Sequence, residues 1–159
     1  MYRIQIFAFV LSSMFPLNIG DCSPCRLNGS DDIFDIQNSS QYSQEYSKLT
    51  RIQQSNVKGR SILVRGNRIE GDKLVDLQDN ADGWTDPRDV RLEVNYPIQG
   101  GFGACITFVE LTVFHNSYRD VFAQFTCGDI YFRNFGIEIR ITTTTYYSYR
   151  AMIYGVIYR

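Results

Sequence analysis

Histidine is almost missing from this chain, and His115 is its only one. Polyhistidine metal sites are therefore excluded, and any histidine-dependent catalysis would rest on this single residue. Positive charge is not in excess either, because 16 lysines and arginines face 17 aspartates and glutamates, for a formal charge of -1. Binding to a phosphate backbone needs a clear excess of cations, so direct nucleic-acid binding is not expected.

No apolar run in the sequence is long enough to cross a bilayer, which takes roughly 20 residues. The run at residues 4–15 (IQIFAFVLSSMF) follows Arg3 and is succeeded by small and polar residues up to Gly20. This pattern is typical of a secretory signal peptide, and a buried N-terminal strand is the alternative. We therefore expect residues 1–20 to be removed, leaving a secreted protein with no membrane segment.

Residues 21–58 are rich in serine, glutamine and asparagine and have few apolar residues. This composition predicts a polar, mobile arm, with a short helix around residues 45–54. Two glycosylation sequons lie in the arm, at Asn28 and Asn38. Both would be accessible to glycosylation in a secreted chain.

From residue 59 to residue 159 the apolar residues recur with a period of two. Ile137, Ile139 and Ile141, for example, alternate with polar neighbours, as expected of a half-buried strand. We predict an all-β domain, an antiparallel sandwich or barrel of about seven short strands, because turn signals separate these segments and no helix is convincing. The predicted strands are residues 61–65, 73–78, 89–96, 105–114, 121–127, 137–142 and 151–158.

The four cysteines can form two disulfides, as expected in a secreted protein. If residues 115–119 turn the chain, Cys105 and Cys127 face each other across a hairpin, and we predict that they pair. Cys22 and Cys25 remain as the possible second pair. Their C-x-x-C spacing lies in a polar arm, without the helix start of a redox motif or the second pair of a zinc site.

The other chemical motifs are weak. His115 lies in a predicted turn, where a histidine is usually solvated, and no serine has a nucleophile-elbow motif. Residues 78–83 only partly resemble a calcium loop, because Gln78 stands where aspartate is expected. The glycine-rich segment 100–103 leads into a strand and not into a helix, so it is not a phosphate cradle. We therefore expect no enzyme, no cofactor and no metal site.

Two aromatic features are candidates for a partner surface. Trp84 lies in an acidic region, where it either packs onto the sheet or is exposed as an anchor, and packing is favoured. Tyr146, Tyr147 and Tyr149 lie beside Arg150 in a basic C-terminal segment, where they could bind a partner or simply pair across strands. The contrast between acidic and basic regions also leaves self-association open.

The order of several short motifs resembles the multiprotein bridging factor 2 family over residues 59–155. The motifs are Gly71-Asp72-Lys73-Leu74, Asp89-Val90, Ile106-Thr107-Phe108-Val109-Glu110 and Ile153-Tyr154-Gly155. The resemblance implies a β-rich insect protein with a signal peptide and no catalytic residues. The family name implies transcription coactivation, through bridging of a DNA-bound regulator to the basal machinery. Many relatives look instead like secreted salivary or haemolymph proteins.

The chain departs from the family pattern at residues 127–130 and at residues 143–149, and the second segment could be a contact surface. We therefore predict a secreted, non-enzymatic protein that works by binding a protein partner or a small ligand. The alternative is a nuclear transcription coactivator that acts through protein contacts.

Overall fold

The computed structural model describes residues 22–25, 50–54 and 59–157. All of the regular elements in this part of the chain are strands: β1 (Thr50–Gln54), β2 (Arg60–Gly66), β3 (Lys73–Tyr96), β4 (Cys105–His115), β5 (Phe122–Cys127) and β6 (Phe135–Val156). Among these residues no helix has the length and apolar character needed to span a membrane. The predicted signal peptide and the sequons at Asn28 and Asn38 lie outside the described residues.

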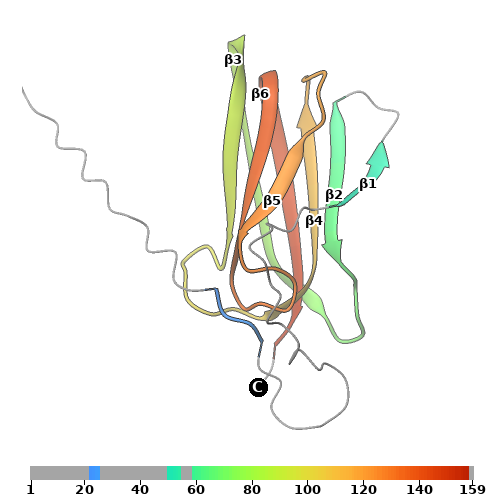
Figure 1. Ribbon diagram of the computed structural model, residues 1–159, viewed down its shortest axis with the longest axis vertical. Helices are drawn as coiled ribbons and strands as arrows, with labels where there is room; N and C mark the ends of the chain where they lie inside the picture. Colours follow the sequence, from blue (N-terminus) through green and yellow to red (C-terminus); the bar gives the residue numbers. More distant parts are fainter. Residues whose placement is uncertain (1–21, 26–49, 55–58, 158–159) are drawn as a thin grey trace, which may run out of the picture.

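The strands form one antiparallel sheet in the order β1-β2-β4-β6-β3, with β5 added to β6 (Figure 1). The predicted all-β class is confirmed. The strand count is six and not about seven, because β3 joins the predicted segments 73–78 and 89–96, and β6 joins 137–142 and 151–158. The strand β1, which was not predicted, is added at the edge.

The sheet folds over on itself within β3 and β6. The side-chain amide of Gln78 donates a hydrogen bond of 2.8 Å to the carbonyl oxygen of Asn95 in the same strand. These two residues would lie roughly 56 Å apart in a straight strand at about 3.3 Å per residue, so β3 doubles back. The bend is where the register with β6 shifts, between Gly83 and Val90. We call residues 83–90 and 141–146 the arch.

The arch divides the sheet into two portions. In the larger portion, β1, β2 and β4 join the first half of β3 and the second half of β6. In the smaller portion, β5 pairs with the first half of β6, which also pairs with the second half of β3. Apolar residues of both portions form a single core, with side chains that are 0–1% exposed, namely Val109, Leu111, Val113, Phe125, Ile137, Ile139, Ile141 and Ile153.

The strand β1 corrects the prediction of a polar arm with a short helix around residues 45–54. Thr50 pairs with Val64 and Gln54 with Ser61, so this segment extends the edge of the sheet beside β2. The neighbouring strand offers backbone hydrogen bonds that outweigh the weak local preference of a polar sequence. Residues 26–49 of the predicted arm lie outside the described residues.

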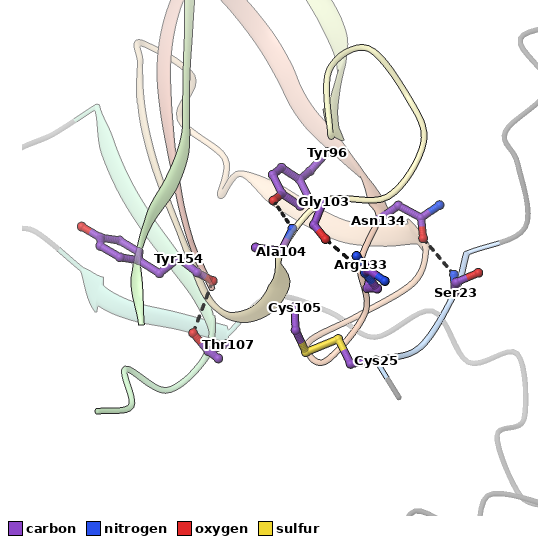
Figure 2. Close-up of a disulfide and its surroundings, with 10 residues drawn as sticks. All are labelled: Ser23, Cys25, Tyr96, Gly103, Ala104, Cys105, Thr107, Arg133, Asn134 and Tyr154. Atoms are coloured by element: carbon purple, nitrogen blue, oxygen red, sulfur yellow. Dashed lines mark hydrogen bonds between the residues drawn. A yellow bond between two sulfur atoms is a disulfide. The ribbon is translucent and has the colours of Figure 1, made fainter. Parts of the chain in front are cut away.

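The predicted disulfide pairing was wrong. Cys22 pairs with Cys127 and Cys25 with Cys105, with Cα atoms 5.9 and 5.8 Å apart, and no cysteine is free. The prediction assumed that β4 and β5 form a hairpin. Instead, β4 pairs with β2 and β6, whereas β5 pairs with β6 in the other portion of the sheet. Each cysteine of the domain therefore bonds to a cysteine of the arm. Figure 2 shows the bridge between Cys25 and Cys105.

Candidate functional site

The smaller portion of the sheet presents a polar outer face. Along β6, Gly136, Glu138 and Arg140 alternate with buried isoleucines, so they lie on the side away from the core. In the register, Arg91 lies opposite Arg140, and Glu93 lies opposite Glu138. We call the outward side chains of residues 91–95, 124–126 and 136–140 the polar floor.

Glu138 organises the charges of the polar floor. Its side chain is only 3% exposed and forms ion pairs with Arg140 Nε and, at 3.0 Å, with Arg91 Nη2. The hydrogen bond from Arg140, aided by both positive charges, lowers the pKa of Glu138 against the opposing effect of burial. Like charges that face each other across strands would repel, and these pairings relieve that repulsion. Both arginine side chains remain more than half exposed, and each guanidinium has more N–H groups than these ion pairs use.

Gly136 makes a depression in the polar floor. A Cβ atom at this position would lie 2.7 Å from Thr126 Oγ1 and 3.1 Å from Asn95 Oδ1. Only a residue without a side chain lets these two polar groups come together from the neighbouring strands. The glycine therefore shapes the polar floor as well as the strand.

The polar floor is the base of a cleft of about 1060 Å³. One wall of the cleft is the loop 97–103, in which Gly100 and Gly101 have φ angles of 75° and 86° that favour glycine. Ile98 and Phe102 of this loop are 67% and 63% exposed. As the sequence indicated, the loop leads into a strand, β4, and not into a helix.

The end of this loop is firmly held (Figure 2). The backbone N–H of Ala104 donates to the hydroxyl of Tyr96 at 2.8 Å, and burial raises the pKa of that hydroxyl. The Arg133 side chain donates to the carbonyl of Gly103, whose own N–H donates to the carbonyl of Arg133. The exposed middle of the loop is therefore supported by a fixed base.

The arm supplies the other wall of the cleft. Cys22 and Ser23 line it, and the segment 22–25 lies at the same end of the sheet as the loop after β3 (Figure 1). The N–H of Ser23 donates to Asn134 Oδ1 at 2.8 Å, and its carbonyl accepts from the N–H of Arg133 at 3.0 Å. Sequence reasoning missed this wall, although the C-x-x-C pair was the signal that the arm is tied to the domain.

A second cleft of about 530 Å³ lies on the other side of Phe102. Leu74 and Ile157 line it together with Phe102, and these side chains are 49%, 68% and 63% exposed. With Ile98 they form a group of exposed apolar side chains at the disulfide-linked end, which we call the apolar rim. Grouped exposed apolar side chains are typical of interaction surfaces, whereas scattered ones are not.

The predicted partner surface is largely buried. Tyr147 and Tyr149 are only 6% and 8% exposed, and burial raises the pKa of each hydroxyl. Both side chains lie at odd-numbered positions of β6, which face the core. The sequence did not show which face is buried, because this segment has aromatic residues on both faces. Trp84 packs 5.8 Å from the ring of Tyr147, as the packing alternative predicted. Of the predicted set, Tyr146 and Arg150 remain exposed.

The prediction that His115 is solvated in a turn was wrong. His115 is buried, because it is the last residue of β4 and the turn begins one residue later. Its Nε2 atom lies 3.3 Å from Ser61 Oγ. Both side chains are buried, at 4% and 2% exposure. A serine nucleophile has to meet its substrate, so this pair does not have the access that catalysis requires.

Three of the family motifs meet at one place. The carboxylate of Asp72 accepts hydrogen bonds from Arg68, from the N–H of Ile69 and from Thr107 Oγ1. The hydrogen bond from Arg68 is the main cause that lowers the pKa of Asp72 to about 2. The Arg68 guanidinium lies 3.7 Å from the ring centroid of Tyr154, whose carbonyl also accepts from Thr107. This motif cluster fixes the turn between β2 and β3.

The fold is an all-β domain, and the motif cluster stabilises the turn between two of its strands. The family described as Transcription activator MBF2 matches residues 65–155, which is more than half of the chain. The chain therefore belongs to this family, and the resemblance seen in its motifs is confirmed. No curated protein and no solved structure matches the chain.

Proposed function

We propose that the protein activates transcription by binding another protein, and that it does not contact DNA directly. Membership in the Transcription activator MBF2 family is the observation that carries this proposal. The formal charge of -1 supports contact with a protein and not with a phosphate backbone. The buried Ser61–His115 pair supports a non-enzymatic role.

The apolar rim is the surface that we assign to this contact. Exposed aliphatic and aromatic side chains next to a polar region have the arrangement of an interaction surface with a central apolar anchor. Leu74 lies near the start of β3, and Ile157 directly follows β6. Phe102 lines the same cleft as these two residues. Burial of this group by a partner removes apolar area from water, which stabilises a complex.

The chain offers a matched control for this surface. Leu74 and Leu77 both belong to β3 and are 49% and 50% exposed, but only Leu74 lines the cleft beside Phe102. A fusion of the full chain to a DNA-binding domain should activate a luciferase reporter. We expect Leu74→Ser to lower this activation several-fold and Leu77→Ser to leave it unchanged. Equal activation by both variants would exclude the apolar rim.

A secreted binding protein is the second candidate function, and the disulfides favour it. All four cysteines are paired, and disulfides persist in oxidising compartments, whereas nuclear proteins keep their thiols reduced. The apolar run at residues 4–15 is consistent with export. In this candidate function the same surfaces would bind a partner outside the cell.

Expression of the full chain with a C-terminal tag in insect cells separates the two candidates. A nuclear protein with free thiols supports transcription activation. A processed protein recovered from the medium, with the Cys22–Cys127 and Cys25–Cys105 bridges found by peptide mass measurement, supports the secreted function. Deletion of residues 2–20 is the control, since it should retain an exported protein inside the cell.

A further inference from the structure

We propose that the cleft above the polar floor binds a saccharide. This cleft shares Ile98 and Phe102 with the apolar rim, but its polar floor does not include Leu74 or Ile157. It assigns a small-ligand site to the outer face of the smaller portion of the sheet.

The charge balance of the cleft favours a neutral ligand. Arg91 and Arg140 bring two positive charges to the polar floor, and Glu93 and Glu138 bring two negative ones. These charges cancel, so the floor as a whole attracts ions of neither sign strongly. A ligand without charge loses less solvation on entering such a site than an ion does.

The hydrogen-bonding groups of the cleft fit a ligand that carries many hydroxyl groups. Asn95 and Gln124 each offer an amide that both donates and accepts, and Thr126 adds a hydroxyl. The free N–H groups of Arg91 and Arg140 add donors. A sugar hydroxyl also donates and accepts, so a saccharide can satisfy both kinds of group at once, and unsatisfied polar groups would be costly.

These groups are held in place before a ligand arrives. Glu138 fixes the two arginines through its ion pairs, and Gly136 lets Asn95 and Thr126 converge on one depression. The Cys22–Cys127 bridge fixes the arm that closes one side. A site in which the side chains are already ordered loses less conformational entropy on binding.

The loop 97–103 supplies the apolar contact that a sugar ring needs. Phe102 and Ile98 are exposed on the wall of the cleft, above the polar floor. One face of a pyranose ring consists mainly of C–H groups and packs well on such a surface. The cleft volume of about 1060 Å³ exceeds that of a single sugar ring and lies at the upper end of the range for ligand pockets.

The full chain with both disulfides intact can be tested on a glycan array that carries neutral, sialylated and sulfated oligosaccharides. Titration calorimetry with the methyl glycoside of the best-bound sugar then gives its affinity, and a glycoprotein that carries the same sugar distinguishes a free saccharide from a displayed one. We expect binding to neutral glycans. We also expect Gln124→Ala and Phe102→Ala each to weaken binding at least about 10-fold.

Tyr118→Ala is the matched control for Phe102→Ala, because Tyr118 is an exposed aromatic residue in the turn between β4 and β5. Its affinity for the glycoside should be unchanged. The proposal is overturned if no neutral glycan binds, if only charged glycans bind, or if Gln124→Ala and Phe102→Ala both bind as the unmodified protein does. Leu74→Ser should leave glycan binding intact, because Leu74 does not line this cleft. Loss of the protein contact and loss of glycan binding can therefore be told apart.

Discussion

The two ends of the folded sheet are stabilised by different interactions. At one end, two disulfides tie the segment 22–25 to the start of β4 and the end of β5, and backbone hydrogen bonds tie it to the loop between β5 and β6. At the other end, the arch has no covalent cross-link among the described residues. It is held by side chains, including the stacked pair Tyr147 and Tyr149 and the ring of Trp84 beside Tyr147.

Both clefts lie at the disulfide-linked end, where loops and not strands form much of the surface. Loop 97–103 and segment 22–25 lie outside the long strands; the disulfides hold segment 22–25, and hydrogen bonds at Gly103 and Ala104 hold the end of the loop. The arch, in contrast, continues the strands and needs only a local adjustment at Thr143, which has a φ angle of 52°. Binding surfaces commonly lie on loops that a rigid scaffold positions, and here the disulfides are part of that scaffold.

The largest expected effect is at the disulfide-linked end. The bridge from Cys25 to Cys105 spans 80 residues, and such a closed loop contributes roughly 4 kcal/mol on the chain-entropy estimate. We expect the double change Cys25→Ser and Cys105→Ser to lower the free energy of unfolding by about 2–4 kcal/mol. Urea unfolding followed by the fluorescence of Trp84, the only tryptophan, measures it. An unchanged midpoint would mean that this bridge adds no stability beyond that of the Cys22–Cys127 bridge.

At the arch we expect a smaller loss from Asn116→Ala. The side chain of Asn116 accepts hydrogen bonds from Thr144 Oγ1 and from the N–H of Thr145, and it donates to Thr145 Oγ1. Thr144 is fully buried, so its hydroxyl would lose one acceptor inside the protein. The loss should be about 1–3 kcal/mol. Ser117→Ala, a change in the same turn, should lower stability less, and an equal loss would mean that the turn matters and not the network at Asn116.

Much of the fold could be predicted from the sequence where one face of a strand is buried. The alternation of Ile137, Ile139 and Ile141 with polar residues predicted both the strand and its core face, because a half-buried strand needs that period. The same alternation placed Glu138 and Arg140 on the outside. It did not show that Glu138 pairs with Arg91, since that contact depends on the register between β3 and β6.

The disulfides and the cleft could not be predicted in this way. The pairing of Cys105 and Cys127 followed from an assumed hairpin between neighbouring segments, but the sheet folds over and separates them. Turn signals between residues 78 and 89 predicted a break between two strands, but they did not show that a single strand doubles back there and stays paired with β6 on both sides. The cleft depends on this fold and on an arm segment more than 70 residues away in sequence from the loop 97–103.

Acid should weaken the disulfide-linked end through Asp72. Its pKa of about 2 in the folded state lies below the usual aspartate value of 3.8, so its carboxylate contributes stability above pH 4. This contribution falls as the pH drops from about 4 toward 2, where the folded protein also takes up the proton. We expect Asp72→Asn to be less stable near pH 6 and to have a flatter stability profile between pH 4 and pH 2, measured by urea midpoints. A profile as steep as that of the unmodified protein would assign the acid sensitivity to another carboxylate.

The smallest effect is expected on the exposed face of the sheet between the two ends. Arg150 and Asp79 lie opposite each other across β6 and β3, with an N–O distance of 3.9 Å and side chains that are 61% and 66% exposed. Water and salt screen such a pair, which contributes well below about 1 kcal/mol. Arg150→Ala should therefore lower the free energy of unfolding, measured by urea unfolding, by no more than about 0.5 kcal/mol. A larger loss that disappears in 1 M salt would show that surface charges, and not only covalent bridges and buried side chains, stabilise this protein.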